Sequence, residues 1–266
     1  MSINQGHRAK KRFGQNFLQD QSVIARIVQN VAPKKEDKIV EIGPGQGALT
    51  IEIMRSSGAI TAIELDRDLL EPLQKTCAPF GTLELHNVDA LKFDFSTLFD
   101  GERKLRLVGN LPYNISTPIL FHLLQHKEII QDMHFMLQKE VVDRMAAVPG
   151  NKSYGRLSIM LQLYCEVTSL FDIGPEAFDP RPKVDSSIVR LVPREKVAVE
   201  IPDHETFAHL VTKSFAQRRK TLRNNLKGLI NDNGFKAANI DPSRRAETLS
   251  LEEFGQLSQY LDITSS

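Results

Sequence analysis

The segment "VEIGPGQGALT", residues 40–50, decides the fold that this sequence predicts. Its three glycines, Gly43, Gly45 and Gly47, separate the apolar run "DKIVEIG" from the amphipathic run "ALTIEIMRSSG", which is typical of a buried strand turning into a helix. Glycines at such a corner permit a tight turn and a close approach of the main chain to a ligand. Many α/β proteins have glycine-rich corners for turn geometry alone, so this segment does not by itself assign a ligand.

The same alternation of strand and helix extends along the chain. Further helices are predicted at 66–77, 116–124 (with Ser116 or Thr117 as N-cap) and 155–167. Further strands are predicted at 59–66, 82–90, 104–110 and 132–139, and residues 168–174 and 186–192 read as an antiparallel pair at the sheet edge. Short, continuously apolar strands are expected where helices cover both faces of a parallel sheet. The sequence therefore predicts a doubly wound, Rossmann-like α/β domain.

The pattern changes near Pro193. Residues 194–202 read as a linker, and the apolar spacing from Asp203 onward is helical, as in Phe207, Leu210 and Val211. We therefore predict a domain over residues 1–193 with a basic N-terminal arm, followed by a small all-α domain over residues 203–266.

Composition limits the class of protein. The 266 residues include 41% hydrophobic residues, enough for a core, and only two cysteines, so a disulfide framework or a zinc site is not expected. No window is apolar enough to span a bilayer, which predicts a soluble, cytoplasmic protein without membrane contact. The formal net charge is +1, yet residues 1–12 and 213–227 are basic blocks without an acid. Such blocks suggest contact with a polyanion, although solvated surface is their commoner meaning.

The spacing of the glycines separates two kinds of cofactor. A dinucleotide-binding corner has the pattern G-x-G-x-x-G, in which the third glycine packs the helix on the strand. This chain has G-x-G-x-G, preceded by Glu41. That pattern resembles the S-adenosylmethionine-dependent methyltransferases, whose cofactor has no pyrophosphate to bind at the helix terminus, and it makes a nicotinamide dehydrogenase a remote alternative.

Polar side chains stand where the next strands end. Glu64 can accept hydrogen bonds from both hydroxyls of a ribose, whereas Asp66 is a rival better suited to cap the next helix. Asp89 follows the third strand and can accept from an adenine amine, or it serves as a cap or turn residue. Ligands of such folds bind at the carboxyl ends of the strands, so their joint position favours a site.

The fourth strand ends in "GNLPYNIS", residues 109–116. Asn110 and Pro112 are turn formers, so a plain turn is the alternative to a catalytic corner. In the catalytic interpretation, the Asn110 side-chain oxygen and the Leu111 carbonyl accept hydrogen bonds from an exocyclic amine, and Tyr113 stacks on its base. Positioning and electrostatics then suffice for transfer from an activated methyl donor, without a metal or a strong base.

Seven motifs in order resemble the bacterial ribosomal RNA small-subunit adenine dimethyltransferases over Arg12 to Leu261: "GQNFL", "VEIGPGQGALT", "IELDRDL", "GNLPYNISTPIL", "MHFMLQKEV", "AFDPRPKVDSSIVRL" and "FAQRRKTLRNNL". The resemblance implies transfer of four methyl groups from S-adenosylmethionine to two adjacent adenosines near the 3′ end of small-subunit rRNA. The expected partner is the immature small subunit and the expected state a monomer. The cofactor contacts that it implies are Asn16, Leu18, Gly43, Gly45, Glu64, Asp89 and Asn110.

The resemblance also implies contacts with the RNA. Phe178 would cover the second face of the target base, an interpretation that we weigh equally with a core position in a proline-rich loop. The "RRKTLRNNL" segment is read as a helix that opens the small domain and binds phosphate. The predicted RNA-binding residues are Arg12, Arg218, Arg219, Lys220 and Arg223.

Two rival functions remain. Related methylases that modify large-subunit rRNA share an Asn-x-Pro-Tyr-type corner, whereas "FAQRRKTLRNNL" and "DPRPKVDS" favour the small-subunit enzymes. A non-catalytic assembly factor or a mitochondrial-type transcription factor would bind nucleic acid through the basic blocks. The intact set of Glu64, Asp89 and Asn110 argues against a loss of catalysis.

Overall fold

The computed structural model describes residues 15–112 and 115–261, and these form two compact units. The first unit contains the chain up to Val142 together with Thr168–Pro193, and the second contains Asp143–Val167 and the chain from Arg194 onward. The sequence predicted a first domain over residues 1–193, whereas the structure groups residues 143–167 with the second unit. They belong there because helix α6 (Arg156–Tyr164) packs on α7 (His204–Ser214) and α10 (Leu251–Ser258).

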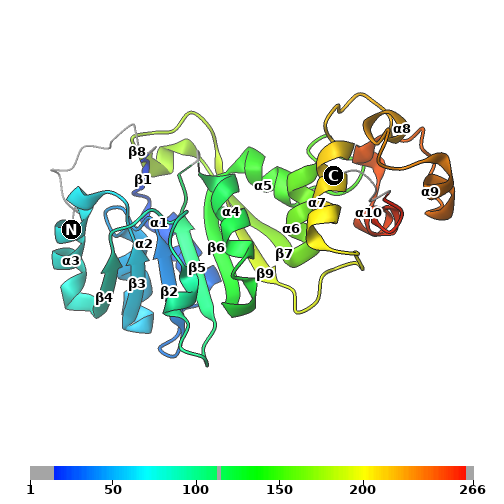
Figure 1. The fold of residues 1–266 in the computed structure, drawn as a ribbon. Helices are drawn as coiled ribbons and strands as arrows, with labels where there is room; N and C mark the ends of the chain where they lie inside the picture. The colour runs from blue at the N-terminus through cyan, green and yellow to red at the C-terminus, as the bar shows by residue number, and fades with distance from the viewer. Residues whose placement is uncertain (1–14, 113–114, 262–266) are drawn as a thin grey trace. The chain divides into compact units, whose positions relative to one another are not determined.

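A seven-stranded sheet forms the centre of the first unit, in the order β4-β3-β2-β5-β6-β9-β7 (Figure 1). Neighbouring pairs from β4 to β6 are parallel, and β9 is antiparallel to β6. The strands are β2 (Lys38–Ile42), β3 (Ala59–Ile63), β4 (Thr82–His86), β5 (Leu105–Asn110), β6 (Ile130–Gln138), β7 (Cys165–Ile173) and β9 (Ser186–Pro193). The predicted α/β class is confirmed, as is the neighbouring position of β7 and β9 at the edge.

Helices cover both faces of this sheet. Helices α1 (Gln21–Val31), α2 (Ala48–Ser57) and α3 (Leu70–Cys77) share one hydrophobic cluster with Ile39, Ile60 and Val108 of the strands. Figure 1 shows α4 (Ser116–Leu124) in front of the sheet. Alternate residues of a strand point to opposite faces, and the first five residues of β5 are all buried, as a doubly covered strand requires.

A side chain caps the start of α1, whereas α4 begins without a side-chain cap. Asp20 caps α1 by accepting from the main-chain nitrogens of Ser22 (2.8 Å) and Val23 (3.2 Å). The prediction of Ser116 or Thr117 as the cap of α4 was wrong, because α4 begins at Ser116 and Ile115 is at the N-cap position. Ser116 is therefore inside the first turn, where its hydroxyl donates to the carbonyl of Pro112 (3.1 Å).

A short two-stranded sheet joins distant parts of the first unit. Strand β1 (Phe17–Leu18) pairs antiparallel with β8 (Phe178–Asp179), and the nitrogen of Gln19 donates to the Ala177 carbonyl at 2.8 Å. This pairing fixes the path of residues 15–20, which we call the N-terminal strap.

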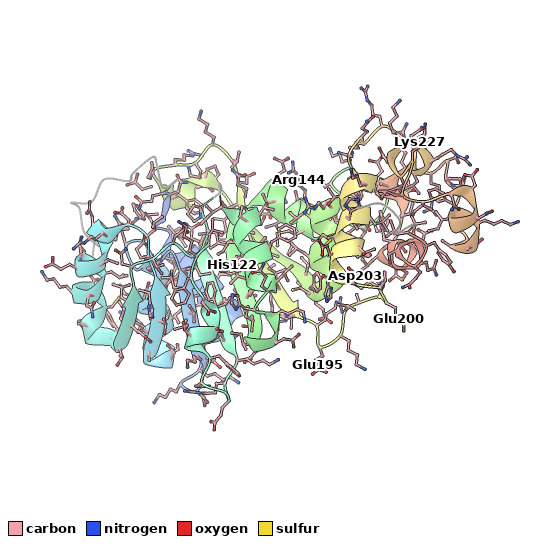
Figure 2. The ribbon with its side chains drawn as sticks, viewed as in Figure 1. His122, Arg144, Glu195, Glu200, Asp203 and Lys227 are labelled. Atoms are coloured by element: carbon pink, nitrogen blue, oxygen red, sulfur yellow. The ribbon has the colours of Figure 1, made fainter. Side chains whose placement is uncertain are left out.

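The second unit is helical, as predicted for the C-terminal part of the chain. Besides α6, α7 and α10 it contains α8 (Leu222–Asn225) and α9 (Asp232–Ala237), and α5 (Lys139–Met145) ends within it. Asp203 (Figure 2) caps α7 by accepting from the nitrogen of Thr206 at 2.8 Å. Phe207, Phe235 and Phe254 are fully buried and form much of the core.

In the part of the chain that the structure describes, no helix has the length and apolar character needed to cross a membrane.

Candidate functional site

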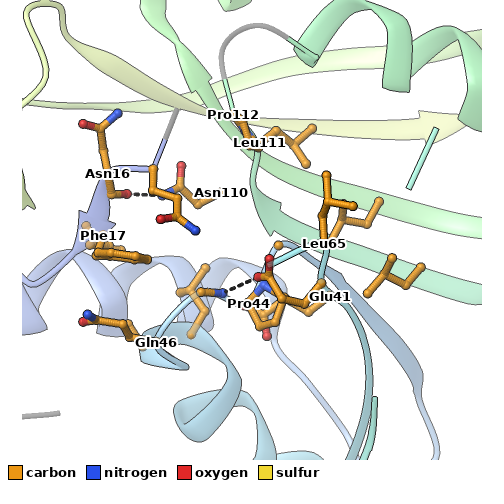
Figure 3. Close-up of a pocket in the computed structure, with 18 of the residues that line it drawn as sticks. Asn16, Phe17, Glu41, Pro44, Gln46, Leu65, Asn110, Leu111 and Pro112 are labelled. Atoms are coloured by element: carbon orange, nitrogen blue, oxygen red, sulfur yellow. Dashed lines mark hydrogen bonds between the residues drawn. The ribbon is translucent and has the colours of Figure 1, made fainter. Parts of the chain in front are cut away.

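A pocket opens at the carboxyl ends of the parallel strands. Its walls come from the ends of β2 and β3, the segment after β4, the end of β5 and the N-terminal strap (Figure 3). These positions are neighbours because the strands are parallel and adjacent in the order β4-β3-β2-β5. In doubly wound folds this edge is where ligands bind.

The glycine corner forms the floor of the pocket. Gly45 has φ +57°, in the left-handed region that favours glycine, and a Cβ there would lie 3.1 Å from the ring of Phe17 in the strap. The nitrogen of Gly45 donates to Oε2 of Glu64 at 3.2 Å. Gly43 and Gly45 both line the pocket, so the predicted corner faces a space large enough for a ligand.

Glu64 is held by two main-chain groups. Its Oε1 accepts from the nitrogen of Asp66 at 2.7 Å, and its Oε2 accepts from Gly45. Burial raises the pKa of Glu64, and the two main-chain hydrogen bonds counteract this rise. Each carboxylate oxygen keeps a lone pair for a further donor, such as a ribose hydroxyl.

The two alternatives for this segment are now separated. Asp66 does not line the pocket; it is buried and accepts from the nitrogen of Asp68 at 3.3 Å as a helix cap. Asp66 also accepts from Nε2 of Gln15 in the strap at 3.0 Å. Glu64 therefore faces the pocket, while Asp66 supports the strap and the start of the next helix.

Asp89 closes a turn and also lines the pocket, while its contact with an adenine amine stays a prediction. Its Oδ1 accepts from the nitrogen of Leu91 at 3.0 Å, which closes a turn, and the residue lines the pocket beside Val88 and Ala90. A carboxylate between small apolar walls suits the amine edge of a flat heterocycle.

Asn110 has a defined orientation at the end of β5. Its Nδ2 donates to the main-chain carbonyl of Asn16 at 2.9 Å (Figure 3). A carbonyl oxygen can only accept, so Nδ2 must point toward Asn16, and Oδ1 then points away from the strap. Among the described residues nothing donates to Oδ1, which leaves an acceptor at the pocket wall.

The rest of the corner is placed only in part. Leu111 and Pro112 line the pocket, and the nitrogen of Leu111 donates to the carbonyl of Met136 at 3.1 Å, which fixes that peptide on β6. Tyr113 lies outside the described residues, so its predicted stacking role stays a prediction.

The strap supplies one wall, while Phe178 does not reach the pocket. Asn16 and Leu18 line the cavity together with Phe17. Phe178 is 5% exposed and lies in the hydrophobic cluster that also contains Leu18 and Ile24. The structure thus places its side chain in the core, which is one of the two interpretations left open by the sequence.

Glu41 is a pocket residue that the sequence motifs did not assign to the site. This residue is 1% exposed, lines the pocket and accepts from Oγ1 of Thr50 at 2.6 Å. Burial raises the pKa of Glu41 to about 7, and the charge of nearby Glu64 adds to this rise. The signal was present as a single acid within an otherwise apolar strand. Two buried carboxyl groups favour a ligand that carries positive charge.

The basic block differs from its prediction. Arg218, Arg219 and Lys220 lie between α7 and α8, outside any helix, so the predicted helix was wrong for these residues and is present only as α8. The chain turns here because Nδ2 of Asn225 donates to the carbonyls of Ser214 (2.7 Å) and Gln217 (3.2 Å).

The cations of this block are not equivalent. Arg218 pairs with Glu247 and Arg223 pairs with Asp232, each at 2.9 Å. Arg219 and Lys220 are exposed and make no ion pair with any residue in the described ranges, and Lys227 is also exposed (Figure 2). Arg12 lies outside the described residues.

Known proteins resemble this chain over nearly its whole length. The family model described as ribosomal RNA adenine dimethylase matches residues 6–262. The ribosomal RNA small subunit methyltransferase A of Saccharophagus degradans is 56% identical over 97% of this chain and 96% of its own length. The protein of the same name from Marinomonas sp. is 53% identical over 98% of each chain.

Two solved structures share the fold. A dimethyladenosine transferase from Plasmodium falciparum has a TM-score of 0.76 at 24% identity, covering 92% of this chain and 99% of that one. The 23S rRNA methyltransferase ErmE has a TM-score of 0.72 at 24% identity, covering 93% of this chain and all of that one.

Proposed function

The chain belongs to the ribosomal RNA adenine dimethylase family, and on that premise we propose that it methylates small-subunit (16S) rRNA. It transfers methyl groups from S-adenosylmethionine to the exocyclic amines of two adjacent adenosines near the 3′ end. Four transfers give two dimethyladenosines, and the modification accompanies assembly of the small subunit.

The pocket fits this methyl donor by its chemistry. S-adenosylmethionine supplies a methyl group that is activated by a sulfonium cation, and it carries a ribose and an adenine. Glu64 would accept from the ribose hydroxyls and Asp89 from the adenine amine, while a cation near the glycine corner would favour the ionised form of Glu41. The carbonyl of Asn16 accepts from Asn110 and keeps one lone pair, and the strap also contributes the apolar surface of Leu18.

The orientation of Asn110 is the observation that most supports amine methylation. An adenine amine is a poor nucleophile because its lone pair is delocalised into the ring. Acceptors that bind both of its hydrogens favour the pyramidal, nucleophilic geometry, and Oδ1 of Asn110 with the Leu111 carbonyl would form such a pair. Preorganised dipoles of this kind lower the barrier without a metal or a strong base. Tyr113 would stack on the base and hold it in place.

Contact with the RNA involves the second unit. Arg219 and Lys220 are exposed and have no acidic partner in the described chain, so they are better placed for phosphate than the paired Arg218 and Arg223. Arg12 keeps its proposed role beside the RNA, whereas the buried position of Phe178 favours a core role over a contact with the target base. The protein acts as a monomer on the immature small subunit in the cytoplasm.

Incorporation of a labelled methyl group tests this function. Undermethylated small subunits, large subunits lacking adenine methylation and unrelated RNA are each incubated with the protein and labelled S-adenosylmethionine. We expect label in small-subunit rRNA alone. Label in large-subunit rRNA would favour the rival activity named in the ErmE structure. Binding of small subunits without any label would favour a non-catalytic assembly factor.

A further inference from the structure

Asn87 connects the two strand ends that form one side of the pocket. It follows β4 directly, and its Nδ2 donates to the main-chain carbonyl of Glu64 at 2.8 Å and to that of Leu65 at 3.3 Å. The nitrogen of Glu64 also donates to the carbonyl of His86 at 2.9 Å. The main chain of residues 64 and 65 is therefore joined to the end of β4 by one main-chain hydrogen bond and by the side-chain amide of Asn87.

The residues joined by this amide are pocket residues, whereas Asn87 is not. Glu64 and Leu65 directly follow β3 and line the pocket, and Val88 and Asp89 line it from the segment after β4. Leu65 is 51% exposed, so packing alone does not hold it in position. The separation of the Glu64 carboxylate from the Asp89 carboxylate depends on how these two segments are joined.

We propose that Asn87 is a positioning residue that fixes Glu64 for the ribose of the methyl donor, an inference that rests on the proposed function. It acts through the main chain of residues 64 and 65 and does not touch the ligand. An asparagine after a strand is commonly only a turn residue, so the two roles must be distinguished by experiment. A turn residue supports folding, whereas a positioning residue supports cofactor affinity.

The location of Asn87 allows the two effects to be separated. The side chain is exposed and follows an edge strand of the sheet, so its loss removes little buried contact. We therefore expect substitutions to leave the melting temperature nearly unchanged. Replacement by aspartate keeps the shape of the side chain but removes the donor, and replacement by alanine removes the donor without adding charge.

The experiment measures binding of S-adenosylmethionine and S-adenosylhomocysteine by calorimetry in the full chain. Asn87→Asp and Asn87→Ala should each raise the dissociation constant for both ligands about 5- to 10-fold. This is about the effect of losing one hydrogen bond between the displaced Glu64 and the ribose. Asn30→Asp is the matched control, because Nδ2 of Asn30 likewise donates to a main-chain carbonyl, that of Arg26 at 2.8 Å, on the exposed surface of α1. This control should bind like the wild type.

Two further readouts separate positioning from a structural role. In steady-state methyl transfer, KM for the methyl donor should rise while kcat at saturating donor stays the same. In a double-mutant cycle with Glu64→Gln, Asn87→Asp should add little further loss, because the contact that it supports is already weakened.

Three results would overturn the inference. Unchanged affinity in both Asn87 variants would do so, as would a fall in kcat at unchanged KM, or a full additional loss in the Glu64→Gln background. If the wild-type protein itself fails to bind the methyl donor, the proposed function falls together with this inference. If the wild type binds and the variants match it, only the role of Asn87 is refuted.

Discussion

Replacement of Glu64 by glutamine should weaken cofactor binding strongly although it changes the size of the side chain very little. Both carboxylate oxygens accept main-chain hydrogen bonds, from Gly45 and from Asp66. Glutamine has one oxygen and one NH2 group, so its NH2 must face one of these two N–H donors. The side chain will then rotate or lose one bond, and the ribose loses a charged acceptor.

The expected magnitude follows from these contacts. A hydrogen bond to a charged group contributes about 1.5–3 kcal/mol, so loss of one such bond to the ribose raises the dissociation constant about 10- to 150-fold. Stability should change less, because an unpaired main-chain N–H is costly while removal of a buried charge is favourable. Burial already disfavours the charged form, as the raised pKa of Glu64 indicates.

Calorimetry with S-adenosylhomocysteine, together with thermal melting, measures both quantities. Glu52→Gln on α2 is a suitable control, since it removes a partly exposed carboxylate that forms an ion pair with Arg55 at 3.1 Å. An affinity of Glu64→Gln within about twofold of the wild type, far below the loss expected for one charged hydrogen bond, would refute the ribose assignment.

Three other perturbations have defined outcomes. Asn110→Ala should lower single-turnover methyl transfer by at least ~10²-fold, whereas Tyr113→Phe should keep most of the rate because the ring is proposed to act; near-normal transfer by Asn110→Ala would reduce the corner to a structural turn. Replacing both Arg219 and Lys220 by alanine should lower the salt dependence of small-subunit binding by about 1 to 2 in the log–log slope, more than replacement of the paired Arg218 and Arg223, and equal effects of the two double variants would contradict this ranking. Both ring nitrogens of buried His134 lack hydrogen-bond partners among the described residues, and Nδ1 lies 4.0 Å from Oδ1 of Asp132. Burial lowers the pKa of His134 from 6.5 to about 4, although the Asp132 charge opposes this shift. The unfolded chain therefore binds a proton that the folded chain excludes, and His134 should lower the free energy of unfolding as pH drops from about 6.5 to 4. His134→Leu should remove this contribution, as urea titrations at several pH values will show.

The features that the sequence predicted correctly depend on short-range patterns combined with topology. Gly43 and Gly45 stand between a strand and a helix, and Glu64 and Asp89 follow strands, so the rule for parallel sheets brings them to one edge. Local sequence also predicted Asp66 as a helix cap, which left Glu64 as the candidate for the ribose. A cap can be recognised because a helix follows it directly.

The features that sequence reasoning missed depend on contacts between distant residues. The carbonyl of Asn16 orients Asn110 across 94 positions, and β1 pairs with β8 from a distant part of the chain. Neither contact leaves a local pattern. The resemblance implied a helix across the basic block, but its first residues form a turn, and Asn225 donates to the carbonyls of Ser214 at the end of α7 and of Gln217 in that turn.

The most direct test of the account is to map the product. Undermethylated small subunits are treated with the protein and S-adenosylmethionine, and the 3′-terminal fragment of the rRNA is analysed by mass spectrometry. We predict a mass gain of four methyl groups, located on the exocyclic amines of two adjacent adenosines, and almost no gain with Asn110→Ala in the time that the wild type needs for completion. Methyl groups on other atoms or other nucleotides, or a full gain with the variant, would contradict it.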